Sequence, residues 1–243
     1  MLVEMHTATT HPDADVSKLP IVNSLNGSLA DRVYLAVKQA ILQLDFPPGA
    51  FIRKAALCDQ LGVSRSPVSE ALARLATEGL VDIVPQSGTR VARLSMAAIR
   101  DDAFLREALE VAAARHAALH RTDEMLARLT RNIEMQKLQV VDVDAKDFFE
   151  TDIALHEMLM ATTGVARLPE TVRMLSSQVD RARQMLLPHS GRLSETVAEH
   201  IDLIDAVARR DAKGAEDAMR HHVRQLIKRL EPLEADRPDL FSK

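Results

Sequence analysis

The stretch Leu61-Gly-Val-Ser-Arg-Ser-Pro-Val-Ser-Glu-Ala-Leu-Ala-Arg-Leu-Ala-Thr-Glu-Gly-Leu80 decides the fold of the first part of this chain. It predicts a tight glycine-containing turn, followed by a short helix whose first turn carries Ser64, Arg65 and Ser66. The helix is expected to close at Gly79, before an apolar run. This layout is typical of a helix-turn-helix, in which the N-terminal end of the second helix meets base edges in the DNA major groove.

The residues on either side of this stretch complete a small domain. From Val81 to Arg93, apolar and polar side chains alternate around a Pro/Ser/Gly turn, which predicts a two-stranded hairpin and hence a winged helix-turn-helix. Gly88 is expected to supply the positive φ of the wing turn. Upstream, Ser28 precedes a helix with apolar residues at i, i+4 spacing, which ends before the turn Pro47–Gly49.

The bulk composition fits a mainly helical protein. The chain has 243 residues, of which 47% are hydrophobic and 3% aromatic, with no Trp, and this favours helices over sheets. The single cysteine, Cys58, cannot form an internal disulfide, so a reducing cytoplasm is expected. No apolar run approaches a membrane span and residues 1–20 are too polar for a signal peptide, so we expect a cytoplasmic protein with no membrane partner.

The charge is unevenly distributed along the chain. The formal net charge is −4, yet residues 28–93 hold eight Lys/Arg against six Asp/Glu and carry +2, while the remainder carries −6. This asymmetry places any nucleic-acid contact in the first third, although +2 is modest for that purpose.

From Ser95 onward the sequence predicts long helical segments joined by short loops. They are expected at about 95–120, 122–140, 144–162, 167–186, 192–209 and 211–230. Six antiparallel helices form an all-α bundle. The predicted organisation is a mobile tail over 1–25, a winged helix-turn-helix domain over 26–94, the helical domain over 95–232 and a C-terminal tail over 233–243.

Three bundle helices place metal-competent side chains on apolar stripes. Asp152 and His156 are four residues apart on one stripe, and His200 and His222 each lie on another. A lone histidine on such a stripe is more often a hydrogen-bonded core residue, but three helices doing so beside a carboxylate favour a shared site. One Asp and three His suit Zn²⁺, or Ni²⁺ or Mn²⁺, with positions open for water or a ligand oxygen.

The other histidines lack this pattern. His221 is expected to point away from the stripe of the last helix, and His116, His120 and His189 are expected to be structural. We therefore assign no metal to these four residues.

Together the motifs resemble a GntR-type transcription regulator of the FadR subfamily. The segments that carry the resemblance are Pro47–Gly49, Leu61–Val81, Leu105–Glu110, Asp152–His156, Glu199–His200 and Met219–His222. The resemblance spans residues 28–230 and implies a winged helix-turn-helix followed by an all-helical ligand-binding FCD domain. It also implies a homodimer that binds a double-stranded DNA operator, with a metal on Asp152, His156, His200 and His222.

The resemblance and the positions of residues on the recognition helix and wing together predict DNA contacts in the first domain, from Arg53, Ser64, Arg65, Ser66, Arg74, Gly88 and Arg90. Arg65, at the start of the recognition helix, is expected to reach the operator bases, whereas Arg74 lies farther down and is expected at a phosphate. The chain departs from the family at Ala55 and Ser69, where the family has basic residues. Arg53 is a candidate replacement at the phosphates.

Arg106 and Glu110 also lie four residues apart, which alone predicts an ion pair on a helix surface. The resemblance implies instead that Arg106 projects into the bundle cavity and holds an effector carboxylate with its planar fork, with Arg181 and Arg183 as further candidates. We therefore expect a repressor controlled by a small organic acid bound beside a metal.

Two alternatives remain open. One is a metal-sensing regulator whose effector is the ion itself. The other is a metal-dependent hydrolase, because a metal with open positions could activate water. The hydrolase has no evident general base and gives no account of the stretch from Leu61 to Leu80, so we expect the chain not to be an enzyme.

Overall fold

The computed structural model describes residues 12–19, 25–84, 86, 88–142, 145–186 and 191–242. The chain forms two compact units, Met1–Arg93 and Leu94–Lys243, and each is described here by itself. Within the described ranges, no helix is both long enough and apolar enough to cross a membrane.

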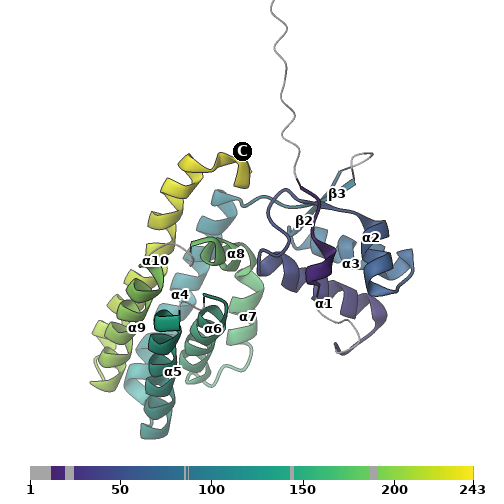
Figure 1. Cartoon of the computed structure of the whole chain (residues 1–243). Helices are drawn as coiled ribbons and strands as arrows, with labels where there is room; N and C mark the ends of the chain where they lie inside the picture. The colour runs from purple at the N-terminus through teal and green to yellow at the C-terminus, as the bar shows by residue number, and fades with distance from the viewer. Residues whose placement is uncertain are drawn as a thin grey trace, which may run out of the picture. The chain divides into compact units, whose positions relative to one another are not determined.

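The first unit is built on α1 (Leu29–Leu42), α2 (Lys54–Leu61) and α3 (Arg65–Thr77) (Figure 1). Helix α1 begins at Ser28, whose hydroxyl accepts from the Asp31 N–H while the Asp31 carboxylate accepts from the Ser28 N–H. This reciprocal capping box satisfies two amide groups that the first turn would otherwise leave unpaired. The expected i, i+4 stripe is confirmed, because Val33, Val37 and Ile41 are fully buried.

The helix-turn-helix is also confirmed. Helix α2 closes at Gly62, which adopts a left-handed conformation with φ of 63° that a side chain would disfavour. Helix α3 then begins at Arg65 and packs Val68, Leu72 and Leu75 into the core of the unit. Its first turn stays exposed to solvent.

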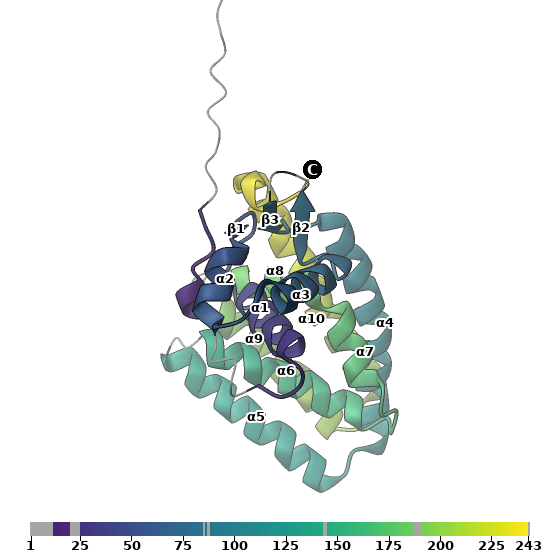
Figure 2. The ribbon, with the colours of Figure 1, turned by 90° about the vertical axis from the view of Figure 1, so that its right-hand side faces the viewer.

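The wing contains one strand more than predicted. Strands β2 (Val81–Val84) and β3 (Gly88–Val91) form the expected hairpin, and β1 (Phe51–Ile52) pairs with β3 on its other side, giving the order β1-β3-β2 (Figure 2). Two residues are too few to show an alternating pattern, so the sequence carried no signal for β1. Gly88 has φ of 103°, as expected of the wing turn.

Part of the predicted N-terminal tail packs against this unit. The N–H of Ala14 donates to the carbonyl of Phe51 at 2.8 Å, and Ala14 and Leu19 are buried in the core. A short 3-10 turn, Val16–Lys18, lies between them. Two apolar anchors in an irregular segment show no periodicity, which is why the sequence predicted a tail.

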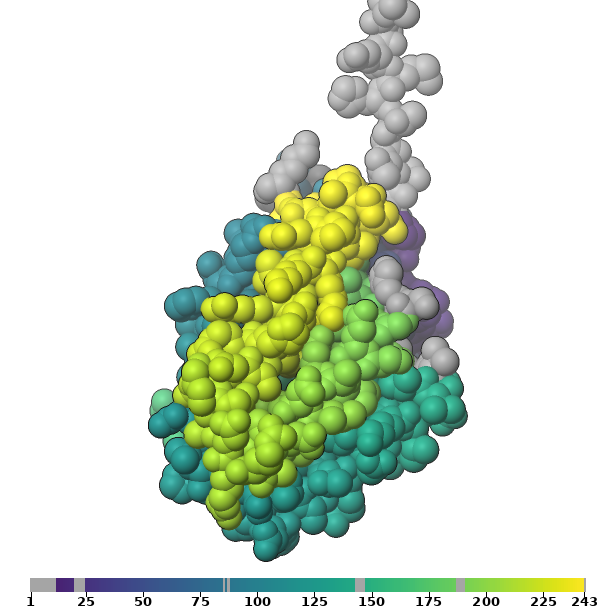
Figure 3. All heavy atoms as spheres, turned by 90° about the vertical axis from the view of Figure 1, so that its left-hand side faces the viewer, coloured from purple at the N-terminus to yellow at the C-terminus, as the bar shows by residue number. Residues whose placement is uncertain are grey.

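The second unit is the expected all-α bundle. Its helices are α4 (Met96–His120), α5 (Asp123–Asp142), α6 (Ala145–Ala161), α7 (Leu168–Leu175), α8 (Ser177–Leu186), α9 (Arg192–Ala208) and α10 (Ala212–Asp236). Ser95 and Thr122 cap α4 and α5 as expected, each accepting from an N–H three residues on. Helices α9 and α10 lie side by side on one face of the bundle (Figure 3).

Two helix boundaries differ from those predicted. The segment expected over 167–186 breaks at Ser176, whose hydroxyl donates to the carbonyl of Val172 at 2.6 Å and competes with the helical pattern. Helix α10 continues beyond residue 230 and passes Pro232 before it ends. The predicted C-terminal tail is also packed, because Phe241 is buried and the Ser242 N–H donates to the Leu94 carbonyl at 2.8 Å.

Candidate metal centre and nucleic-acid interface

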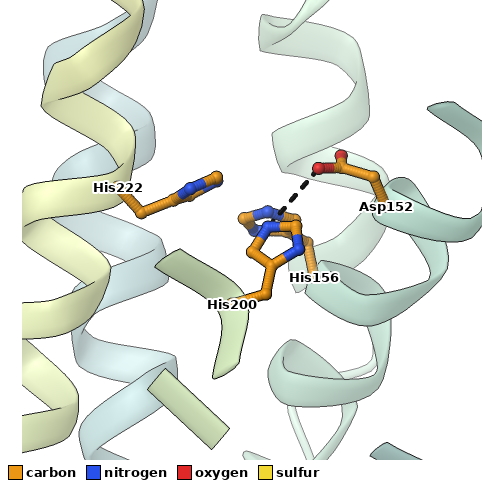
Figure 4. Close-up of side chains that lie close together, drawn as sticks. All are labelled: Asp152, His156, His200 and His222. Atoms are coloured by element: carbon orange, nitrogen blue, oxygen red, sulfur yellow. Dashed lines mark ion pairs between the residues drawn. The ribbon is translucent and has the colours of Figure 1, made fainter. Parts of the chain in front are cut away.

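Four side chains from three helices of the second unit converge on one point (Figure 4). Asp152 and His156 come from α6, His200 from α9 and His222 from α10. One potential ligand atom from each lies within 4.8 Å of all the others. All four side chains are buried, with exposed fractions of 8% or less. The structure therefore brings together the whole predicted ligand set.

The apolar stripes predicted from the sequence account for this convergence. Leu159 on α6, Ile204 on α9 and Met219 on α10 are buried one turn or less from the ligands. Because each stripe must face the bundle interior, the polar group embedded in it faces inward too. The sequence thus fixes both the helices and the inward direction of each ligand.

Each histidine is held by a partner on another helix. The Nδ1–H groups of His156, His200 and His222 donate to Glu110 Oε2, Gln136 Oε1 and Glu199 Oε2, the last two at 2.7 and 2.8 Å. This arrangement leaves Nε2 of each ring as the coordinating atom. Metal-ligating histidines almost always donate their other ring N–H to such an acceptor.

Two of the Nε2 atoms lack a hydrogen-bond partner. The structure shows none for buried Nε2 of His156 or of His200 among the residues it describes. A buried nitrogen lone pair without a donor is costly, and a metal ion removes that cost. The donor set of three imidazoles and one carboxylate therefore fits a divalent transition ion such as Zn²⁺.

The protonation state of the site suits metal binding. Burial, together with the neighbouring imidazoles, lowers the pKa of His200 and His222 well below its usual value. The rings are therefore neutral at pH 7, which is the form that coordinates a metal. The rings also lie close, with the centroids of His200 and His222 4.6 Å apart.

The carboxylate ligand has a cationic neighbour. Asp152 forms an ion pair with Arg183 of α8, and its Oδ1 lies 3.4 Å from His200 Nε2. Arg183 also lies over the ring of Phe149, 5.2 Å from its centroid. A guanidinium thus contacts the one anionic group of the ligand set.

Two predictions were made for Arg106, an ion pair with Glu110 and a place at the bundle cavity, and the structure bears on both. Its Nε donates to Glu110 Oε1 at 2.6 Å, which makes the predicted ion pair, but the pair is buried rather than on the surface. Burial alone would raise the pKa of Glu110, yet Arg106 and His156 together lower it below its ordinary value. Arg106 also lines a small cavity that His222 borders. Its contact with an effector stays a prediction.

The sequence missed the acceptors that orient the histidines. Gln136 lies on the buried stripe of α5 with Leu129 and Ile133, so a polar residue among apolar ones was a usable signal. Glu199 precedes a predicted ligand, and Glu110 was seen only as the partner of Arg106. Their pairing with particular histidines depends on how separate helices pack, which local patterns do not contain.

The other histidines that the structure describes lie outside the cluster. His221 is exposed, as expected, and points away from the buried stripe. The rings of His116 and His120 on α4 lie 4.3 Å apart. His189 falls outside the residues that the structure describes.

The start of α3 presents the expected DNA-contact residues to solvent. Ser64 is the N-cap residue, although its side chain accepts no capping hydrogen bond, and Arg65 and Ser66 are exposed. Ala55 and Ser69, where basic residues were expected, are exposed as well. The N-terminal turn of this helix is therefore free to enter a groove.

The other predicted DNA contacts have partners within the first unit. Arg74 Nη1 donates to Asp31 at 2.6 Å and its guanidinium lies 4.0 Å from the Tyr34 ring centroid. Arg53 donates to Asp13 at 2.7 Å. Arg90, on the wing beside Gly88, lies 4.2 Å from the ring centroid of Phe51. Each would have to share or exchange its partner to contact a phosphate.

Comparison with known proteins agrees with both units. Residues 29–91 match the family described as bacterial regulatory proteins, gntR family, and residues 103–225 match the FCD domain. An uncharacterized HTH-type transcriptional regulator from an unstable DNA locus of Streptomyces ambofaciens is 35% identical over 86% of this chain and 88% of its own length. The HTH-type transcriptional repressor RspR of Escherichia coli K12 is 30% identical, over 87% of this chain and 93% of its own.

Solved structures share the fold. The structure of E. coli McbR/YncC superposes with a TM-score of 0.71 at 22% identity, covering 86% of this chain and 99% of that one. A GntR transcriptional regulator from Rhodococcus sp. RHA1 gives 0.71 at 20% identity, over 85% and 99%. Both sequence relatives are transcriptional regulators, which agrees with the expectation of a regulator rather than a hydrolase.

Proposed function

This chain belongs to the gntR family of bacterial regulatory proteins with an FCD domain, and we propose that it is a repressor whose operator affinity is set by a small carboxylate bound beside a divalent metal. It is a DNA-binding transcriptional regulator, as its relatives are. A relative that is 30% identical, RspR, is a repressor, which supports the proposed direction of regulation. The proposed place of action is the cytoplasm, where the operator lies.

One observation carries the metal part of this proposal. Asp152, His156, His200 and His222 bring their ligand atoms within 4.8 Å of one another in a buried site. Each imidazole has its Nδ1–H engaged and its Nε2 left for the ion. The metal supplies a Lewis acid with coordination positions that a carboxylate oxygen of the effector can fill.

The exposed first turn of α3 supports the DNA part. Ser64, Arg65 and Ser66 are exposed at its N-terminal end, where backbone N–H groups and side chains can reach phosphates and base edges. In this proposal Arg65 contacts the operator bases and Arg53, Arg74 and Arg90 contact the backbone.

We also propose a homodimer that binds a two-fold symmetric operator, since a single winged unit carries little excess positive charge. The support within the bundle is the exposed apolar surface of α4, where Phe104 is 73% and Leu105 41% exposed. Sedimentation equilibrium on the wild type and on Phe104→Ser tests this. A wild-type protein that sediments as a monomer contradicts it.

The metal and the operator can be tested on the same preparation. Bound sequences are first selected from a random duplex pool, and operator affinity is then measured by fluorescence anisotropy for zinc-loaded and chelator-treated protein. We expect about one zinc ion per chain by elemental analysis. A protein that purifies without metal, and whose thermal melt ignores added Zn²⁺, contradicts the proposal. Affinity that follows free zinc alone, with no effect of any organic acid, would favour the metal sensor.

A further inference from the structure

The proposed effector site brings several arginine side chains to one small cavity. The small cavity beside the metal position is lined by Ala103, Arg106, Val179, Arg183, Arg192 and His222, with two apolar residues of α10 at its edge. Three guanidinium groups from α4, α8 and α9 thus border one enclosed space. Arginine binds carboxylates through two parallel N–H···O bonds, which makes such a cluster suited to anions.

The three arginines differ in how well they are neutralised. Arg106 is paired with Glu110 at 2.6 Å. Arg192 Nη1 is buried and forms ion pairs with Glu199 at 3.5 Å and Glu195 at 3.7 Å, but it has no hydrogen-bond partner among the described residues. Both oxygens of Glu199 already accept, one from Arg229 and the other from His222, each at 2.8 Å. Arg192 therefore has a buried donor that its two ion-pair partners do not satisfy with a hydrogen bond.

Arg183 forms an ion pair with a carboxylate that is also a predicted metal ligand. Its partner is Asp152, one of the four predicted ligands. Its other acidic neighbour, Asp180, lies 3.6 Å away, beyond hydrogen-bond distance. When a divalent ion binds Asp152, the carboxylate is shared between the ion and Arg183, so the ion pair with Arg183 becomes weaker.

We propose that the effector carries two anionic groups, as a dicarboxylate does, with one on the metal and the other between Arg183 and Arg192. This inference rests on the proposed function and names the ligand class of its effector site. A monocarboxylate that binds the metal supplies no further hydrogen-bond acceptor to Arg183 and Arg192, whereas a dianion can bind the metal and the two arginines together. Arg106, already neutralised by Glu110, serves mainly to hold His156 through that carboxylate.

The cavity volume adds a requirement for side-chain movement. The cavity measures about 30 Å³, which is room for about two water molecules. A dicarboxylate is larger, so at least one lining side chain must move as it binds. Arg183 is the candidate for this movement, because metal binding at Asp152 would weaken the ion pair that holds the Arg183 side chain in place.

The test uses the zinc-loaded full-length protein and isothermal titration with matched acids. Succinate and glutarate are compared with propanoate and butanoate at constant ionic strength, and zinc content is measured after each titration to exclude chelation. We expect the diacids to bind at least about tenfold more tightly than the monoacids. Arg192→Gln should reduce this preference to about twofold or less, and Arg183→Gln should also reduce it.

Arg224→Gln is the matched control, since Arg224 is an exposed arginine paired with Glu107 on the far side of α10 from the cluster. It should keep the full preference, and circular dichroism and zinc content should show that all variants are folded and loaded. Equal binding of diacids and monoacids, unchanged by Arg192→Gln, overturns the dianion inference while leaving the carboxylate effector standing. Failure of every acid to bind overturns the inference and the effector part of the proposed function together.

Discussion

At the scale of single residues, the proposed metal site depends on acceptors that are not themselves candidate ligands. Gln136 accepts from His200 Nδ1 at 2.7 Å, and its own amide nitrogen donates to Asn132 at 2.8 Å. This pair of bonds fixes the ring orientation of His200 and leaves Nε2 toward the other ligands. At position 136, a residue of similar volume that lacks a hydrogen-bond acceptor would no longer hold the His200 ring in this orientation.

We predict that Gln136→Met weakens zinc affinity by about 10- to 100-fold while the protein stays folded. Methionine fills a similar volume, so packing changes little, but the Nδ1–H of His200 loses its acceptor. Competition with a chromophoric chelator measures the affinity. Gln139→Met is the control, because Gln139 lies on the same helix and donates to Thr151 rather than to a ligand. Equal losses in the two variants would mean that the effect is one of helix stability.

The lowered pKa of His200 and His222 gives a pH prediction for the folded protein. A lowered pKa disfavours the imidazolium, so protons do not compete with the metal until the pH falls well below 6.5, the ordinary value for histidine. Three imidazoles of ordinary pKa would lose about fiftyfold in affinity between about pH 7.5 and 6. We expect a loss of less than about tenfold over that range. A zinc titration at each pH that shows the larger loss contradicts the pKa direction.

Arg65 is the residue on which operator recognition depends most in our proposal. It is exposed in the first turn of α3, and no ion pair or hydrogen bond ties its guanidinium within the described part of the chain. Arg65→Ala should weaken specific operator binding by about 1–3 kcal/mol and leave the circular dichroism spectrum unchanged. Arg237→Ala removes an exposed arginine from the other unit and should leave affinity unaltered. Operator affinities of the two variants, measured by fluorescence anisotropy, show whether binding depends on the position of Arg65 or only on the total charge of the protein.

At the scale of helices, the metal would add a direct link between elements that already meet through apolar contacts and hydrogen bonds. Its ligands come from α6, α9 and α10, and their acceptors Glu110, Gln136 and Glu199 lie on α4, α5 and α9. Helix α7 supplies neither a ligand nor an acceptor to the site. The ion would thus cross-link most of the bundle and leave α7 aside.

Hydrogen exchange with and without zinc tests this cross-link. An ion that binds only the folded state stabilises it by about 2.7 kcal/mol at a hundredfold excess over Kd. We expect the largest slowing of amide exchange in α6, α9 and α10, and the smallest in α7. Uniform slowing throughout the second unit would mean that the ion acts on global unfolding alone. No slowing would contradict metal binding to the folded bundle.

The sequence predicted elements well wherever a periodic pattern was long enough. The stripes of α6, α9 and α10 predicted that all four candidate ligands face the bundle interior, because burying an apolar face determines where its polar members point, and the structure brings the four together. The break between α7 and α8 at Ser176 was not predicted, because no Gly or Pro occurs at that position. Strand β1 went unseen because two residues carry no period.

Local sequence patterns could not predict which side chains pair between helices that are far apart in the sequence. His156 and Glu110 are 46 positions apart, and His200 and Gln136 are 64 apart. Only the packing of α4 against α6 and of α5 against α9 brings them together. The same holds for Arg183 and Arg192, whose shared cavity depends on the placement of α8 beside α9 and α10. The candidate ligands were predicted, and the family resemblance pointed to Arg106 and Arg183, but Arg192 and the acceptors that orient the histidines were not predicted.

At the scale of the whole molecule, the DNA-binding unit and the FCD unit meet in sequence at Arg93 and Leu94. Regulation requires that the state of the second unit changes the free energy of operator binding by the first. Such coupling is typically worth about 1–3 kcal/mol, or roughly 5- to 150-fold in affinity. Linkage makes it reciprocal, so the operator must change zinc affinity by the same factor.

We therefore predict equal factors in two measurements: the operator Kd of zinc-loaded against metal-free protein, and the zinc Kd with and without saturating operator. His222→Asn should remove the zinc dependence of operator binding because it removes a ligand. His221→Asn, a change at the neighbouring exposed histidine, should retain it. If loaded and metal-free wild type bind the operator equally, the ion is a structural cross-link, and control of DNA binding must then come from the organic ligand alone. If both variants lose the dependence, the coupling depends on the stability of α10 rather than on the ligand set.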